Sequence, residues 1–145
     1  MNGERVLIDT SVWIAFFRKG DGRLGEKVDE VLNLCDVFVP RVVMAELIQG
    51  ARSEKEIAVI EDFLEAFHVI DQREDTWLKA GRLSYTMKRR GLCPGLIDCY
   101  VAVLASDNGC AVFSLDEHFG HIVDFLKIDL FRSDRVDSGR RKRRR

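Results

Sequence analysis

Short apolar runs rich in β-branched residues recur along the chain and predict buried strands. The clearest are Val6–Ile8, Val37–Val39 and Ala111–Phe113. Runs of this length without polar alternation are typical of a sheet that is covered on both faces. His68–Ile70 is a weaker fourth candidate, and Phe125–Leu130 is the candidate for a last, edge strand. The pattern therefore predicts four or five strands.

The stretches between these runs show helical spacing. Apolar side chains recur at i, i+3, i+4 and i+7 from Val28 to Cys35, and Ile57–Leu64 shows the same period with one charge intruding. Two further helices are predicted at about Trp77–Arg90 and about Leu96–Asp107, and glycine follows each of them as it commonly follows helix ends. Strands that alternate with helices predict an α/β fold, with a mostly parallel central sheet covered by helices on both faces.

The composition fits a single globular domain. The chain has 145 residues, of which 46% are hydrophobic, and no apolar stretch reaches the ~20 residues needed to cross a bilayer. Met1 leads almost directly into the first predicted strand without the features of a secretory signal, so the expected location is cytoplasmic. The four cysteines form no CxxC pair and are expected to be reduced core residues.

The charges are distributed unevenly along the chain. The net charge is −1, but six of the 23 basic residues lie in Arg140–Arg145, so the remainder carries 17 basic against 24 acidic residues. We expect a globular domain over residues 1–133 and a basic tail over 134–145 that is too charged to pack and is disordered. The tail either contacts the phosphates of a nucleic acid or is simply solvated, and the sequence leaves both open.

Acidic residues stand near the ends of the predicted strands. Asp9 directly follows the first strand, and Asp116 lies two residues past Ser114 at the end of a later one. Glu46 lies about two turns into the helix after Val37–Val39. Ligands of parallel α/β sheets bind beyond the carboxyl ends of the strands, so these acids are expected at one rim.

Each acid also has an ordinary structural interpretation. Asp98 is the only charged residue in PGLIDCYVAVLA, and a first-turn Asp gains about 0.3 to 1 kcal/mol from the helix dipole. Asp9 or Ser11 would serve as an N-cap. Glu46 would suit an exposed helix position, and Asp116 a turn.

The acids are more informative as a group. Two like charges about 4 Å apart repel by roughly 4 kcal/mol at an effective dielectric near 20, so carboxylates that converge must take up protons or cations. Arg41 is the only basic residue in the segments around Glu46, Asp98 and Asp116. A bound metal ion is therefore the simpler expectation.

The donor types favour a hard ion. Carboxylate oxygens without a matching set of His or Cys favour Mg²⁺, with Mn²⁺ as the alternative, over zinc. His118 and His121 are three residues apart but have no cysteine partner, which argues against a four-ligand zinc site.

Four segments, LIDTSVWI, AELIQGAR, GLCPGLIDCYVAVLA and FSLDEHFGHI, resemble the acidic motifs of PIN-domain ribonucleases, and among them the VapC-like toxins of toxin–antitoxin pairs. Their order and spacing agree from about Val6 to Phe131. The resemblance implies a three-layer PIN-like fold and four metal-binding acids, Asp9, Glu46, Asp98 and Asp116.

The resemblance also assigns neighbouring positions. Ser11 matches a hydroxyl that hydrogen-bonds within the site, Thr10 occupies a variable position beside it, and Ser114 matches the Thr or Ser at the end of the fourth strand. His118 stands where many relatives carry Asp, so a further acid is missing there. The implied activity is endoribonuclease cleavage that leaves a 5′-phosphate and a 3′-hydroxyl, in a homodimer inhibited by a small antitoxin protein.

Three other functions compete with this interpretation. Haloacid-dehalogenase-type phosphatases need a second Asp where this chain has Ser11, and receiver domains need an acidic pair after the first strand, where Asp9 is solitary. The stronger rival is a PIN-like module that binds RNA or protein without catalysis. The presence of all four acids argues against it.

Two more groups suggest interfaces. The cluster Trp13, Ile14, Phe16 and Phe17 is expected to be mostly core, with the remainder available to an antitoxin helix or a dimer partner. Arg82 and Lys88–Arg90 precede the Asp98 motif, and either guide RNA toward the metal or stabilise the end of their helix.

Overall fold

The computed structural model describes residues 3–19 and 22–131 of the chain. The predicted basic tail and the predicted domain boundary at residue 133 lie outside these described residues. The element boundaries and contacts given below therefore concern the two described ranges.

The centre of the fold is a five-stranded parallel sheet. Its strands are β1 (Arg5–Ile8), β2 (Asp36–Pro40), β3 (His68–Ile70), β4 (Ala111–Phe113) and β5 (Asp129–Phe131). They lie in the order β3-β2-β1-β4-β5, and every neighbouring pair is parallel. The predicted parallel sheet is confirmed, including the weak candidate at His68–Ile70.

The predicted edge strand Phe125–Leu130 is partly wrong. The strand begins at Asp129 and pairs through Phe131 with Phe113. The backbone N–H groups of Phe125 and Leu126 donate to the carbonyl of Ile122 instead, at 2.9 and 3.0 Å. This apolar segment therefore begins as turns that continue a preceding helix, which periodicity alone does not separate from a strand.

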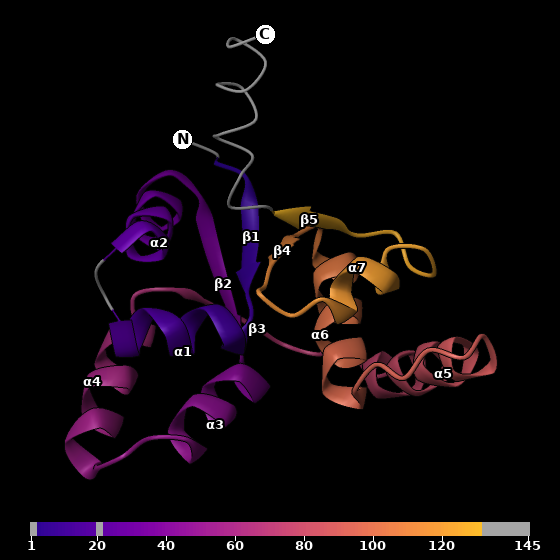
Figure 1. The fold of residues 1–145 in the computed structure, drawn as a ribbon, viewed down its shortest axis with the longest axis horizontal. Helices are drawn as coiled ribbons and strands as arrows, with labels where there is room; N and C mark the ends of the chain where they lie inside the picture. Colours follow the sequence, from indigo (N-terminus) through magenta and orange to yellow (C-terminus); the bar gives the residue numbers. More distant parts are fainter. Residues whose placement is uncertain (1–2, 20–21, 132–145) are drawn as a thin grey trace, which may run out of the picture.

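Seven helices are found in the described part of the chain. They are α1 (Thr10–Lys19), α2 (Gly22–Leu34), α3 (Arg41–Gln49), α4 (Glu54–Leu64), α5 (Thr76–Arg89), α6 (Leu96–Asn108) and α7 (His118–Ile122). Helices α1 to α4 lie on one side of the sheet and α5 to α7 on the other (Figure 1). Right-handed crossovers require this division, because the chain moves outward from β1 to β3 and then returns to β4 and β5.

Helix α6 packs in the interior of the protein, and this explains its sequence. Its residues from Cys99 to Ala105 are all buried, as are Val6, Leu7 and Ile8 of β1. A helix that is covered on all sides is apolar on all sides. The helix ends at Gly109, whose φ of +64° is a left-handed conformation that glycine adopts without strain. Asp98 thus stands at the first turn of a helix with few other places for a charge.

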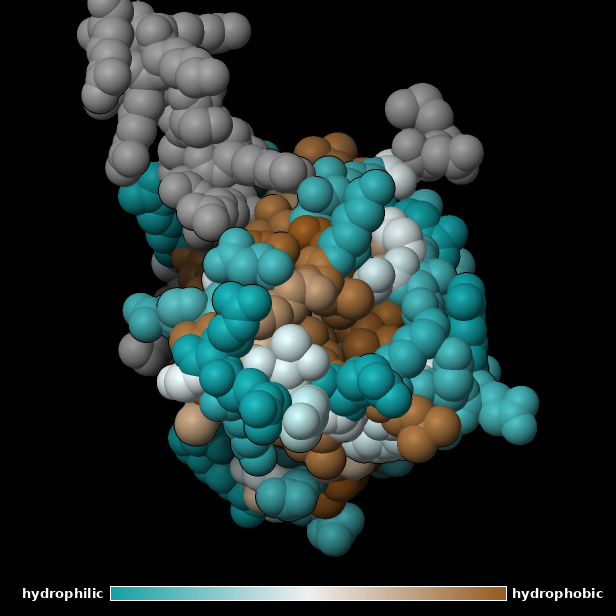
Figure 2. Space-filling model, turned by 90° about the vertical axis from the view of Figure 1, so that its right-hand side faces the viewer, coloured by the Kyte–Doolittle hydropathy of each residue, from teal (hydrophilic) through white to brown (hydrophobic). Residues whose placement is uncertain are grey.

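The aromatic cluster of α1 is mostly core, as predicted. Trp13 is fully buried among rings that include Phe16 and Phe17, and Ile14 is 39% exposed. More strongly exposed apolar side chains lie elsewhere, and they include Leu78 and Tyr85 of α5, which are 77% and 60% exposed, and Leu34 of α2, which is 69% exposed. The side of the molecule that carries α5 to α7 shows hydrophobic patches between hydrophilic ones (Figure 2).

The cysteines are all free, and their predicted burial holds in part. Cys99 and Cys110 are buried, and Cys35 is partly buried against the core. Cys93 is exposed, so its assignment to the core is wrong. It lies in the turn between α5 and α6, where a small side chain need not be buried. Among the described residues, no helix has the length and apolar character to cross a membrane.

Candidate metal centre

Asp9 follows β1 directly, at the point where the order of the strands in the sheet reverses. The chain leaves β1 toward β2 on one side, while β4 pairs with β1 on the other. The backbone N–H of Asp9 donates to the carbonyl of Phe113 at 2.9 Å, which continues the ladder by one residue. Asp9 is therefore next to Ser114 in the crevice where parallel α/β sheets bind ligands.

The carboxylate of Asp9 accepts hydrogen bonds from two hydroxyl groups. Its Oδ2 lies 3.0 Å from Ser11 Oγ and 2.9 Å from Ser114 Oγ, and the residue is only 6% exposed. Ser11 Oγ in turn accepts from the backbone N–H of Leu115 at 3.0 Å. These bonds satisfy the oxygen of a buried carboxylate, whose burial would otherwise be costly.

These contacts correct the capping interpretations. The Asp9 side chain accepts from hydroxyl groups, while its backbone carbonyl accepts the N–H groups of Val12 and Trp13. Ser11 lies inside α1 and is not its N-cap. The sequence allowed a cap at either residue because Asp and Ser are both common there. The pairing with β4 that occupies their side chains is not visible in local sequence.

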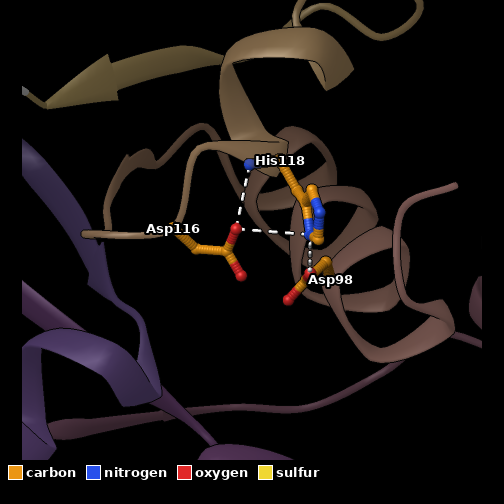
Figure 3. Close-up of side chains that lie close together, drawn as sticks. All are labelled: Asp98, Asp116 and His118. Carbon is orange, nitrogen blue, oxygen red and sulfur yellow. Dashed lines mark hydrogen bonds and ion pairs between the residues drawn. The ribbon is translucent and has the colours of Figure 1, made fainter. Parts of the chain in front are cut away.

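Asp116 is held in the loop after β4 by two backbone bonds. Its N–H donates to Ser114 Oγ at 2.9 Å, and its Oδ1 accepts the N–H of His118 at 2.9 Å. The second bond is the turn expected of this Asp. The turn and the functional role are compatible, since it points Asp116 toward α6 (Figure 3).

His118 joins Asp116 to Asp98. Its Nδ1 lies 3.2 Å from Asp98 Oδ2 and 3.3 Å from Asp116 Oδ1, and all three side chains converge (Figure 3). In the sequence, this histidine has only two interpretations, as a zinc partner of His121 and as the replacement of an acid. Its place two residues after Asp116, in a turn, was the available signal that it faces the same rim.

The electrostatics of the cluster are those of crowded carboxylates. Burial raises the pKa of Asp98 from 3.8 to about 6; the hydrogen bond from His118 opposes the rise, and the charges of Asp116 and Asp9 add to it. Arg41, five residues before Glu46, pairs with Asp71 in an exposed ion pair. The cluster thus holds several negative charges without a nearby guanidinium or ammonium among the groups that act on Asp98.

Glu46 is held separately from the other acids. It reaches from α3 to the start of α1, where its Oε1 accepts from Thr10 Oγ1 at 2.7 Å. Thr10 is adjacent to Asp9, so Glu46 is near the same strand end, but no contact among the described residues links it to Asp98 or Asp116. Thr10 was treated as a variable neighbour in the sequence, and its contact with a distant helix was not predictable from spacing.

The donor atoms fit a divalent ion. One atom each from Asp98, Asp116 and His118 lies within 4.8 Å of the other two. Carboxylate oxygens are the ligands that Mg²⁺ and Mn²⁺ prefer, and an imidazole nitrogen suits transition ions better than Mg²⁺. Asp9 is connected to this group through Ser114.

Comparison with known proteins identifies the family of this chain. The family model described as PIN domain matches residues 6–124. The chain is 27% identical over 126 residues to Ribonuclease VapC1 of Methanocaldococcus jannaschii, covering 86% of each chain.

Two solved structures share the fold. VapBC2 from Rickettsia felis, bound to a DNA fragment from its promoter, matches with a TM-score of 0.72 at 17% identity, over 88% of this chain and 97% of the other. VapBC-5 from Mycobacterium tuberculosis, a member of the VapBC family of toxin–antitoxin systems, matches with a TM-score of 0.63 at 22% identity, over 88% and 98%. The predicted resemblance to this family is confirmed, and the chain belongs to the PIN-domain family.

Proposed function

We propose that this protein is a divalent-metal-dependent endoribonuclease and the toxin of a toxin–antitoxin pair. The observation that carries the proposal is the convergence of Asp98, Asp116 and His118 beside the buried Asp9, at the carboxyl ends of β1 and β4. Such a cluster of partly buried carboxylates is stable at neutral pH when it holds a cation. Membership in the PIN-domain family and the likeness to a VapC ribonuclease support RNA as the substrate.

The proposed reaction is hydrolysis of a phosphodiester bond. Water forms a bond to phosphorus, the bond to the 3′-oxygen breaks, and the products carry a 5′-phosphate and a 3′-hydroxyl. A divalent ion bound at the site supplies polarisation of the phosphate, a lower pKa for the attacking water and stabilisation of the leaving oxygen. Mg²⁺ is the first choice from the oxygen donors, and Mn²⁺ is the alternative.

The side chains of this protein have distinct parts in that reaction. Asp9, Asp98 and Asp116 would hold the ion, and Ser11 and Ser114 keep the Asp9 carboxylate in place through their hydroxyl groups. Either Asp98 or Glu46 orients the attacking water. The carboxylates bind and orient, and none of them needs to attack the phosphate itself.

Removal of divalent ions tests the proposal directly. With 5′-labelled RNA and the full chain, we expect cleavage with Mg²⁺ or Mn²⁺, no cleavage in excess EDTA, and full recovery when the ion is restored. The new 5′ ends should accept label from polynucleotide kinase only after phosphatase treatment. Cleavage that persists in EDTA, or products with cyclic 2′,3′-phosphates, would contradict the proposed reaction.

Replacing Thr10 by valine should weaken the site moderately. Valine keeps the shape of threonine but cannot donate to Glu46, whose bond of 2.7 Å is lost. A hydrogen bond to a charged group is worth about 1.5 to 3 kcal/mol, so we expect cleavage to slow by about ten- to a hundredfold if Glu46 acts in the reaction. Thr10→Ser retains the hydroxyl and serves as the matched control in initial-rate measurements. Equal rates for the two variants would exclude a role for this contact.

Partners and organisation follow the same proposal. The VapBC structures that share the fold support a cognate antitoxin protein as the partner of this chain. A homodimer, a location in the cytoplasm, and a division into a nuclease domain of residues 1–133 and a basic tail of residues 134–145 are the remaining parts of the proposal. The exposed basic residues Arg82, in the middle of α5, and Lys88–Arg90, at and beyond its end, are candidates to guide RNA toward the site.

A further inference from the structure

His118 is the feature of the site that the proposed reaction leaves without a role. It is the first residue of α7, and its side chain is 49% exposed, so solvent and ions reach it. The same atom, Nδ1, faces both Asp98 Oδ2 and Asp116 Oδ1, at 3.2 and 3.3 Å. An imidazole nitrogen that faces two carboxylate oxygens either bears a proton that it donates to them or binds a metal ion together with them.

The spacing of the three atoms suits ligation of one ion. Neighbouring ligands of an octahedral ion with bonds of about 2.1 Å lie about 3.0 Å apart. The two distances from His118 Nδ1 are close to this value, and the three donor atoms fall within 4.8 Å of one another. Small side-chain rotations therefore suffice to place all three on one ion.

The backbone already fixes the histidine in this position. Its N–H donates to Asp116 Oδ1 at 2.9 Å, and Asp116 is held by Ser114 Oγ. Support of this kind orients ligands before an ion arrives. The other histidine of the helix, His121, is exposed and outside the group of donors, and it provides a natural comparison.

We propose that His118 is a nitrogen ligand that makes this site select a first-row transition ion, Mn²⁺, over Mg²⁺. The inference rests on the proposed function, since it concerns the same metal centre. Imidazole nitrogen binds first-row transition ions well, whereas Mg²⁺ prefers oxygen ligands and gives up its waters reluctantly. A carboxylate at this position would make all the donor atoms oxygen. A histidine supplies a nitrogen and so changes which metal ion the site prefers.

The test compares His118→Asp and His118→Ala with the matched control His121→Ala in the full chain. Calorimetric titration with Mn²⁺ and with Mg²⁺ measures the ratio of the two affinities. We expect His118→Asp to lower the preference for Mn²⁺ by about tenfold or more, because it exchanges a nitrogen for a charged oxygen. His118→Ala should weaken Mn²⁺ binding more than Mg²⁺ binding, and His121→Ala should match the original protein.

A spectroscopic measurement separates ligation from a general charge effect. Electron spin-echo modulation of bound Mn²⁺ detects a directly coordinated ¹⁴N nucleus. The modulation should be present in the original protein and in His121→Ala, and absent in His118→Asp. If His118 is instead a cation that occupies the site in place of metal, the modulation will be absent throughout and His118→Ala will bind both ions more tightly.

The outcomes also distinguish this inference from the proposed function. Binding of Mn²⁺ and Mg²⁺ with no nitrogen coupling and an unchanged affinity ratio in His118→Asp would overturn the role of His118, while metal-dependent cleavage stood. If neither ion bound to the original protein, the proposed metal-dependent function would fail, and the role of His118 with it.

Discussion

Asp9→Asn is expected to abolish RNA cleavage while the protein remains folded. The substitution keeps the size of the side chain and an oxygen that accepts from Ser11 and Ser114, which hold Oδ2 at 3.0 and 2.9 Å in the original protein. It removes the negative charge of a residue that is only 6% exposed. Loss of one buried carboxylate from the proposed metal site should cost more than about 4 kcal/mol of transition-state stabilisation, or over a thousandfold in rate.

The measurement pairs initial rates of RNA cleavage with thermal unfolding. Asp62→Asn is the matched control, because Asp62 is an exposed residue of α4 and its change removes a charge without touching the site. We expect Asp62→Asn to cleave at the original rate and Asp9→Asn to unfold within a few degrees of the original protein. Normal cleavage by Asp9→Asn would show that Asp9 is not part of the metal centre. If the variant failed to fold, Asp9 would have a structural role.

The sequence predicts most of the strands and helices that position Asp9. The parallel sheet and the helices on both faces follow from short apolar runs separated by helical periods, and such patterns are read from the hydrophobicity of successive residues, which is a local property of the sequence. Ser11 and Ser114 were assigned to the site by the resemblance, and the structure shows how their hydroxyl groups reach one carboxylate oxygen.

The contacts of His118 and Thr10 were harder to predict, for a physical reason. Thr10 bonds to Glu46 across 36 positions of the chain, and His118 bonds to Asp98 across 20. Such contacts depend on how helices on the two faces meet the strand ends, and the spacing of residues within one element carries no information on this. The residue type of His118 was also misleading. Its spacing from His121 suggests only a zinc site, and the chain has no cysteine partner for such a site.

Asp98→Asn is expected to make the metal-free protein more stable and the enzyme inactive. The pKa of Asp98 is about 6 in the folded protein, against 3.8 for the free side chain, because burial and the charges of Asp116 and Asp9 disfavour ionisation. The folded state thus binds this proton more tightly than the unfolded state, so stability rises as pH falls from above 6 toward 4. Asparagine resembles the protonated form at every pH and still offers an oxygen to His118.

The expected gain in stability of Asp98→Asn follows from the rise in the pKa of Asp98. A difference of about two pKa units corresponds to at most about 3 kcal/mol at pH 7.5. The Asp98 side chain is 20% exposed, and relaxation reduces the gain to on the order of 1 to 3 kcal/mol, or several degrees in melting temperature. In EDTA, Asp98→Asn should melt above the original protein at pH 7.5 and together with it near pH 4. Its cleavage should fall by more than about a hundredfold.

Addition of metal should reverse the order of stability at neutral pH. An ion that binds only the folded state raises its stability in proportion to the logarithm of its concentration over the dissociation constant. The original protein should therefore gain stability with Mn²⁺, whereas Asp98→Asn should gain little. A variant that melts lower than the original protein in EDTA at pH 7.5 would show that the Asp98 charge stabilises the fold, as a first-turn helix residue does. The higher melting temperature would instead identify a charge that destabilises the free protein and is retained for the ion that it binds.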